Sequence, residues 1–316
     1  MLDDATQKQY YIPMTHLKTK AYAKINLSLN VTGVQENLHT LDMIMTTIDL
    51  YDDISITKRH DNKININYIN GKNTPDDIAG SISVGFDSVT RAVLLFKDKL
   101  DAKLQKNFGV DIKVIKNIPL NSGLGGSGVD AAAVFVALQK MYATDFALEQ
   151  LAKQVGSDCT YQLRGGYARV EGVGDKITFL NCNRIYHIVV AMGRRGVLSK
   201  DSFAAFDQMY PSKAKVVSDN DEFVKELLEV ASPQDYNYKF IENALRKPSA
   251  YLNSSIIATL IYLSEAGARK AIMTGSGAAC VGFFNNKADA QKAAKAIQAS
   301  AIKDGCSVWA VATCTK

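Results

Sequence analysis

The sequence of 316 residues is poor in the residues that mark metal, redox and disulfide proteins. It has four histidines, none in an H-x-x-x-H spacing, so a zinc enzyme is not expected. Its five cysteines form no C-x-x-C pair, which is typical of free thiols in a reducing compartment (Cys159, Cys182, Cys280, Cys306 and Cys314). No window approaches about 18 uninterrupted apolar residues, and the polar, acidic N-terminus does not resemble a signal peptide. We therefore expect a cytoplasmic protein without a membrane partner.

Charge of one sign is also not in large excess. The chain has 37 Lys and Arg against 32 Asp and Glu, a formal net charge of +5. This balance suits a small anionic substrate, but it is too weak and too scattered to predict nucleic-acid binding. The length allows one large or two medium domains, and the sequence contains no internal repeat.

The most informative stretch is Pro119–Ala133, PLNSGLGGSGVDAAA. Four of the six residues from 123 to 128 are glycines, between an apolar run at 109–116 and an Ala-rich segment at 130–142. Glycine lets backbone N–H groups approach a ligand closely, and a helix N-terminus adds unpaired donors and a positive dipole end. Together these features predict a binding site for an anion, most simply a phosphate.

Several known phosphate sites do not fit this loop. It matches G-x-G-x-x-G, but a Rossmann site needs an acidic residue at the end of the next strand, and Glu149 lies in a helical pattern with no strand between. The sequence contains no G-x-x-x-x-G-K-[ST], H-R-D or D-F-G string. A purely structural glycine turn and a phosphate cradle of another family stay open at this point.

Residues 19–30 alternate polar and apolar residues and predict a strand, with Lys24, Asn26, Ser28 and Asn30 on one face. A solvent-exposed face is the simplest interpretation of this segment alone. Elsewhere the pattern predicts an α+β chain with a seam near 180–195. The expected strands are 41–50, 53–58, 62–70, 109–116, 167–171, 176–180, 185–192, 270–273, 281–284 and 307–312, and the expected helices are 84–104, 130–142, 147–155, one from 199, 222–230, 240–245, 254–265 and 288–301.

Four segments, in order, carry a family resemblance over nearly the whole chain. Ala23–Leu29 is similar to A-K-[IL]-N-L-x-L, Ile118–Ala132 to the motif I-P-x-x-x-G-L-G-G, and Met273–Ala278 to M-S-G-S-G. Gly156–Tyr161 is similar to G-A-D-V-P-F, although Asp158 alone would suggest only a helix cap. The chain thus resembles the GHMP kinase superfamily.

The resemblance implies a fold, a domain division and an activity. The fold is α+β and has two domains, an N-terminal domain like ribosomal protein S5 domain 2 and a ferredoxin-like C-terminal domain. Residues 1–18 would be a tail, 19–182 the ATP-binding and catalytic domain, and 183–316 the substrate domain. The implied enzyme is a small-molecule kinase that uses ATP and Mg²⁺, as a monomer or homodimer. Its implied substrate is a cytidine diphosphate-linked polyol, 4-diphosphocytidyl-2-C-methyl-D-erythritol, phosphorylated at the 2-hydroxyl for non-mevalonate isoprenoid synthesis.

The resemblance also implies site residues. Asp158 would accept the proton of the substrate hydroxyl, and Lys24 would favour the ionised carboxylate and stabilise charge at the reacting centre. Substrate contacts are implied for Asn26, His39, Phe203, Gly275 and Ser276. ATP contacts are implied for Lys116, Pro119, Leu120, Asn121, Ser122, Gly123, Leu124, Gly125, Gly126, Ser127, Gly128 and Val129.

Among the positions that depart from the family pattern, two bear most directly on the expected activity. Leu38 stands where a tyrosine would form one half of an aromatic clamp on cytosine, leaving Phe203 as the other half. Val129 stands where a hydroxyl that serves the metal or the β-phosphate is expected. Two alternatives therefore stay open: a kinase for another hydroxylated metabolite, and a paralogue that binds nucleotide without catalysis.

Overall fold

The computed structural model describes residues 14–71, 79–193, 195–229, 236–303 and 308–316. Most of the expected tail lies outside the described residues, and the first strand begins at His16 rather than at Thr19. The strands are β1 (His16–Gln35), β2 (Leu38–Arg59), β3 (Ile64–Asn70), β4 (Gly109–Lys116), β5 (Ala168–Gly172), β6 (Lys176–Phe179), β7 (His187–Gly193), β8 (Glu242–Asn243), β9 (Lys270–Met273), β10 (Cys280–Phe284) and β11 (Val308–Cys314).

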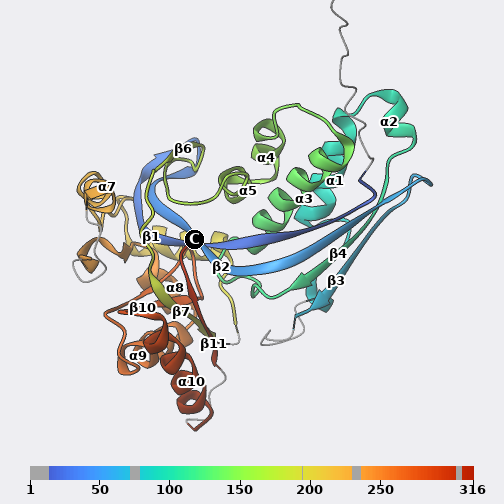
Figure 1. Cartoon of the computed structure of the whole chain (residues 1–316). Helices are drawn as coiled ribbons and strands as arrows, with labels where there is room; N and C mark the ends of the chain where they lie inside the picture. Colours follow the sequence, from blue (N-terminus) through green and yellow to red (C-terminus); the bar gives the residue numbers. More distant parts are fainter. Residues whose placement is uncertain (1–13, 72–78, 194, 230–235, 304–307) are drawn as a thin grey trace, which may run out of the picture.

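The helices join these strands into two layered units (Figure 1). They are α1 (Ser88–Lys99), α2 (Ala102–Lys106), α3 (Gly126–Tyr142), α4 (Glu149–Val155), α5 (Ser157–Gln162), α6 (Ser199–Met209), α7 (Asn220–Glu229), α8 (Arg246–Leu252), α9 (Ser255–Glu265) and α10 (Lys287–Lys303), with 3₁₀ turns at Ala79–Ser81 and Tyr238–Phe240.

A seven-stranded sheet and a four-stranded sheet organise the chain. The first has the order β3-β4-β2-β1-β8, with β5 paired to β2 and β6, and the second has the order β11-β7-β10-β9. Helices α1, α3, α4 and α5 lie over the first sheet, and α9 and α10 pack against the second (Figure 1). This is the expected α+β arrangement.

The polar face of β1 is buried, so the interpretation of a solvent-exposed face is wrong. Lys24, Asn26, Ser28 and Asn30 are at most 6% exposed, and the intervening apolar residues are at most 3% exposed. Burying these polar groups is costly unless each finds a partner. The face is therefore occupied by specific hydrogen bonds and not by water.

Two other expectations are corrected by tertiary contacts. The expected helix at 240–245 is instead strand β8, which pairs in parallel with Ser28 and Leu29 of β1, and a helix follows at Arg246–Leu252. The Asn243 amide donates to the carbonyls of Met273 and Gly275, both at 2.8 Å, which fixes the segment in an extended form. Contacts of this kind override helix propensity.

Strand and helix boundaries also differ. Residues 41–58 form one continuous strand, β2, because pairing with β1, β4 and β5 supports it along its length. The expected helix at 84–104 divides at Leu100, and Asp101 caps α2 by accepting from the Leu104 N–H at 2.8 Å. A side-chain cap of this kind starts a new helix.

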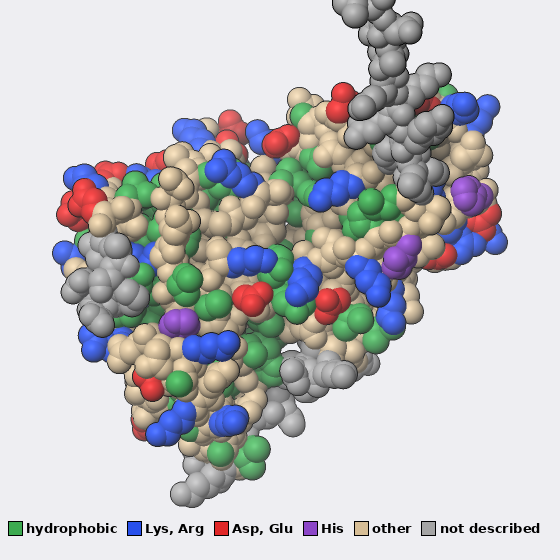
Figure 2. All heavy atoms as spheres, viewed as in Figure 1, with side chains coloured by type: hydrophobic (Ala, Val, Ile, Leu, Met, Phe, Trp, Pro, Cys, Tyr) green, Lys and Arg blue, Asp and Glu red, His purple; other side chains and the backbone are tan. Residues whose placement is uncertain are grey.

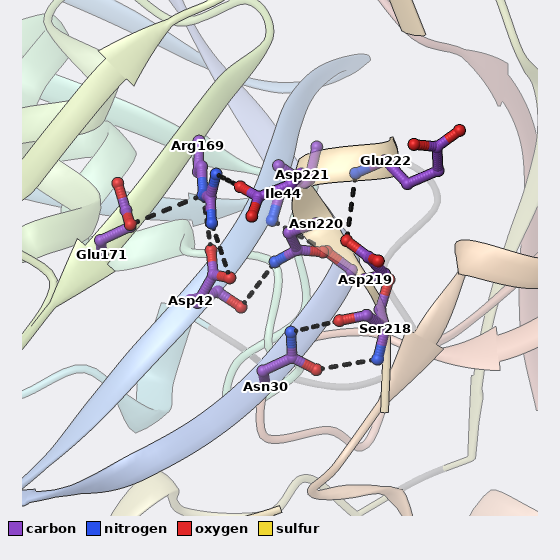
Figure 3. A network of polar contacts seen from close by, with 11 residues as sticks. Asn30, Asp42, Ile44, Arg169, Glu171, Ser218, Asp219, Asn220, Asp221 and Glu222 are labelled. Atoms are coloured by element: carbon purple, nitrogen blue, oxygen red, sulfur yellow. Dashed lines mark hydrogen bonds and ion pairs between the residues drawn. The ribbon is translucent and has the colours of Figure 1, made fainter. Parts of the chain in front are cut away.

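Arg169 is the centre of a polar network that joins β2, β5 and α7 (Figure 3). Its guanidinium contacts both oxygens of Asp42, at 2.9 and 3.1 Å, and Asp221 Oδ1 at 2.6 Å. Asn220 donates to the Asp42 carbonyl at 3.0 Å and accepts from the Ser28 hydroxyl at 2.6 Å. The network thereby attaches the start of α7 to the first sheet.

The described cysteines, Cys159, Cys182, Cys280 and Cys314, are free thiols, as expected, and Cys306 lies outside the described residues. Figure 2 shows Lys and Arg side chains interspersed with Asp and Glu on the face that it draws. Among the described helices, none is long and apolar enough to cross a bilayer.

Asn30 should contribute strongly to stability. Its Oδ1 accepts from the N–H groups of Val217 and Ser218 at 2.8 and 3.0 Å, and its Nδ2 donates to the Ser218 carbonyl at 2.8 Å. Asn30→Ala leaves these buried groups unpaired, so we expect a loss of about 2 kcal/mol or more in the free energy of unfolding. Urea denaturation measures it, with the exposed Asn107→Ala as a control within about 0.5 kcal/mol of the wild type. If both substitutions lowered the free energy of unfolding equally, the stabilising role assigned to Asn30 would be wrong.

Candidate active site

A pocket of about 400 Å³ lies over the glycine loop. It brings together the loop, the first turn of α5, the start of α6 and the second glycine motif, which are far apart in the sequence. Its wall consists of Ser81, Ile82, Pro119, Leu120, Asn121, Ser122, Gly123, Gly125, Gly126, Ser127, Asp158, Val197, Ser199 and Ser276.

Helix α3 begins inside the glycine loop, four residues before the expected start. Gly126 and Ser127, its first two residues, line the pocket. The N–H groups of a first helical turn have no partner within the helix, and the dipole is positive at this end. The pocket wall therefore suits the phosphates of a nucleotide.

The second glycine motif supports the loop by direct backbone contact. A Cβ at Gly275 would lie 2.7 Å from the Gly123 carbonyl oxygen, and one at Gly123 would lie 2.3 Å from the Thr274 oxygen. Neither position has room for a side chain. The Ala279 N–H also donates to the Ser122 carbonyl at 3.0 Å. Gly275, expected at the substrate, thus packs against the loop, whereas Ser276 lines the pocket.

Lys24 and Asp158 form an ion pair at the edge of this pocket. Lys24 Nζ lies 3.6 Å from Asp158 Oδ1 and donates to Asn26 Oδ1 at 2.9 Å. The lysine side chain is 7% exposed and the aspartate side chain 38% exposed. A buried cation thus faces a carboxylate that a substrate can reach. This arrangement suits proton abstraction from a hydroxyl beside a bound phosphate.

The loop positions 128 and 129 have opposite surroundings. The Val129 side chain is fully buried and faces a second cavity, bounded by residues 19–22 and 162–166. Position 128 faces α5, because a Cβ on Gly128 would lie 2.9 Å from Asp158 Cβ and 3.1 Å from the Cys159 nitrogen. Val129 therefore does not alter the phosphate side of the loop, and α5 packs on α3 at a distance that only glycine permits.

Lys116 lies beneath the loop and does not line the pocket. Its ammonium is held by Asp52 and Asp130 in the interior. The side chain that was expected to contact ATP is therefore buried away from the pocket. Leu124 is also buried, and its carbonyl accepts from the Lys24 N–H at 3.1 Å.

His39 and Phe203, both expected at the substrate, lie together. Their rings are stacked at a centroid distance of 4.6 Å, and His39 Nε2 contacts Asp207 Oδ1 at 2.7 Å. Leu38, which precedes His39 in the chain, is 58% exposed. The stack gives an aromatic surface, with an exposed aliphatic side chain in the place of the expected tyrosine.

Family models match both halves of the chain. The model of the GHMP kinases N terminal domain matches residues 87–169, and that of the GHMP kinases C terminal matches residues 222–303. The chain belongs to the GHMP kinase family. The predicted resemblance and the two-domain fold are thereby confirmed, whereas the boundary expected at residue 182 lies between the matched segments and stays a prediction.

Curated relatives of this GHMP kinase extend over most of its length. One from Clostridium tetani (strain Massachusetts / E88), named 4-diphosphocytidyl-2-C-methyl-D-erythritol kinase, is 34% identical over 274 residues, 85% of this chain and 91% of the relative. One of the same name from Clostridium perfringens (strain SM101 / Type A) is 33% identical, over 88% of this chain and 92% of its own.

A solved structure agrees with the fold. A crystal structure of 4-(cytidine 5'-diphospho)-2C-methyl-D-erythritol kinase superposes with a TM-score of 0.74 at 24% identity, covering 95% of this GHMP kinase and 100% of that chain.

Sequence reasoning did not identify four residues of the pocket wall: Ser81, Ile82, Val197 and Ser199. Ser199 Oγ lies 2.8 Å from Ser276 Oγ, and the Val197 N–H donates to the Asn121 carbonyl at 3.0 Å. Only Ser199 carried a signal, because the helix expected from that residue places it at an N-terminus.

Gly128→Ser tests the packing of α5 on the loop in this GHMP kinase. Although it adds a hydroxyl to the loop, its Cβ would displace Asp158, so we expect kcat to fall at least about tenfold, since small misplacements of reacting groups are costly. Steady-state ADP release measures it. Val129→Thr, which adds a hydroxyl on the far side, is the matched control and should give no gain in kcat. A gain in kcat for Gly128→Ser would show that the assigned contact is wrong.

Proposed function

We propose that this GHMP kinase transfers the γ-phosphoryl group of ATP to the 2-hydroxyl of 4-diphosphocytidyl-2-C-methyl-D-erythritol, in the cytoplasm. The Lys24–Asp158 pair at the edge of the glycine-loop pocket carries the proposal. The names of relatives that are 33% and 34% identical over most of both chains support the choice of substrate.

In the proposed reaction, Asp158 accepts the proton of the substrate hydroxyl. The hydroxyl oxygen forms a bond to the γ-phosphorus, the bond between that phosphorus and the β–γ bridging oxygen breaks, and ADP leaves. Phosphoryl transfer depends mainly on positioning and on stabilisation of negative charge. The loop N–H groups supply the positioning, and Lys24, 3.6 Å from Asp158, supplies a fixed positive charge beside the reacting atoms.

The donor groups of the pocket are compatible with Mg²⁺. Asp158 is the one carboxylate among the described residues that line it. Mg²⁺ usually binds one or two carboxylates and completes its shell with water and substrate phosphates. We propose that Asp158 and the phosphates of ATP would hold the ion, which would neutralise charge on those phosphates.

A kinase for another hydroxylated metabolite is the second candidate, because Leu38 stands where the family pattern has a tyrosine. A non-catalytic nucleotide binder is the third. ATP binding without turnover of the cytidine compound would favour these two, and turnover of other polyols would separate them.

Asp158→Ala tests the proposed base. We expect kcat for the cytidine substrate to fall by about 10²- to 10⁴-fold, the contribution typical of general base catalysis, while ATP binding persists. ADP release and nucleotide titration measure the two effects. Asp145→Ala, at an exposed aspartate before α4, is the control and should retain full activity. An unchanged kcat for Asp158→Ala would exclude Asp158 as the base.

Leu38→Tyr tests cytidine recognition. A tyrosine at position 38 restores the aromatic residue of the family pattern and should lower the KM for the cytidine substrate about tenfold, within the range of base stacking on an aromatic side chain, with no change in the KM for ATP. Leu94→Tyr, at an exposed leucine on α1, is the control. A KM for the cytidine substrate that does not respond would argue for a different substrate.

A further inference from the structure

Three ionisable side chains are buried together beneath the glycine loop. Lys116 Nζ, at the end of β4, donates to Asp130 Oδ2 on α3 at 2.6 Å and to Asp52 on β2. The side chains of Lys116, Asp52 and Asp130 are 1%, 0% and 3% exposed. We call these three residues the loop anchor.

The loop anchor holds both ends of the loop. Asp52 Oδ1 accepts from the N–H groups of Asn117 and Ile118, at 2.5 and 2.8 Å, directly before the loop begins at Pro119. Asp130 lies in the second turn of α3, whose first turn is the pocket wall. Because Lys116 connects the two carboxyl groups, the entry of the loop and the helix that leaves it are fixed to one point.

The charges of the loop anchor do not balance if all three groups are ionised. Two carboxylates and one ammonium would bury a net negative charge, which is strongly unfavourable. Burial raises the pKa of Asp130 well above its usual value, against the attraction of Lys116 and with the charge of Asp52 adding to the rise. Tyr68, on β3, is the other titratable group that interacts with Asp130, and its hydroxyl donates to Asp87 at 2.6 Å.

The surroundings of Asp130 Oδ1 favour a neutral, protonated carboxyl group. It is buried, and among the described residues it has no hydrogen-bond partner. An ionised oxygen in that position would lack any donor, whereas one oxygen of a neutral carboxyl group carries little charge.

We propose that Asp52, Lys116 and Asp130 form a neutral buried unit, in which Asp130 keeps its proton, and that Asp52 and Lys116 are positioning residues for the nucleotide phosphates. The unit acts through the loop backbone, since none of its side chains lines the pocket. The positioning role rests on the proposed ATP site.

The double variant Asp52→Asn/Lys116→Met tests the positioning role, because it removes the ion pair without leaving a lone buried charge. We expect the Kd for a fluorescent ATP analogue to rise at least tenfold, with kcat at saturating ATP reduced less than threefold. If the double variant does not fold, Asp52→Glu takes its place. It keeps the charge but shifts the acceptor oxygens by one methylene, and it should also raise the Kd for the ATP analogue. A folded variant of either kind with the wild-type Kd overturns the positioning role.

Asp130→Asn tests whether Asp130 is protonated in the folded protein, because asparagine has nearly the shape of the neutral acid and no charge. A carboxyl group with a raised folded pKa stabilises the protein fully below its ordinary pKa and loses that contribution as the pH rises toward the folded value. The difference in Tm, variant minus wild type, should therefore increase from pH 4 to pH 8, with Kd and kcat within threefold of the wild type. A difference that decreases with pH, or a tenfold loss of ATP affinity, overturns the neutral assignment.

These readouts separate the two proposals. If the wild-type chain bound no ATP analogue, the proposed function would fail, whereas the pH dependence of Tm would still decide the protonation state of Asp130. If ATP binds and the double variant binds equally well, only the positioning role fails.

Discussion

The active site depends on one steric constraint, the direct backbone contact between Gly123 and Gly275. A Cβ at either glycine would lie within 2.7 Å of a carbonyl oxygen of the other motif. The contact places the glycine loop of the first half against a loop of the second half, and the Thr274 hydroxyl accepts from the Asn26 N–H of β1 at 2.8 Å. The pocket wall therefore includes residues of both halves of the chain, with Asp158 from the first and Ser276 from the second.

The parts of the site that the sequence predicted are those carried by contiguous motifs. Strand β4 has the expected bounds, the loop lines the pocket, and Lys24 and Asp158 meet although 134 positions separate them in the chain. Asp158 could be predicted as a site residue only from the order of the family-like motifs, because its local sequence indicates only a helix cap. The alternation of polar and apolar residues predicted strand β1 and its two faces. It could not predict that the polar face is buried, because this burial depends on Ser218 and Asn220 from the second half.

The parts that could not be predicted depend on distant partners or on the direction of a side chain. The family resemblance implied a nucleotide contact for Lys116, but Asp130 and Asp52, which lies 64 positions earlier, hold its ammonium in the interior. Val129 is a main departure from the family pattern, but helix α3 starts early enough to turn that side chain toward the second cavity and away from the pocket over the glycine loop. Strand β8 has only two residues, Glu242 and Asn243, too few for any periodicity to reveal.

Strand β8 also bears on how the chain folds. It lies at the edge of the first sheet beside β1, although it comes from the second half of the sequence. A first half made alone would leave the β1 edge open to pairing with other chains, which is a common route to aggregation. The two family domains are therefore separate in sequence but share one sheet, so their unfolding should be cooperative. During synthesis, the first half is complete before strand β8, which pairs with the edge of its sheet, has been made.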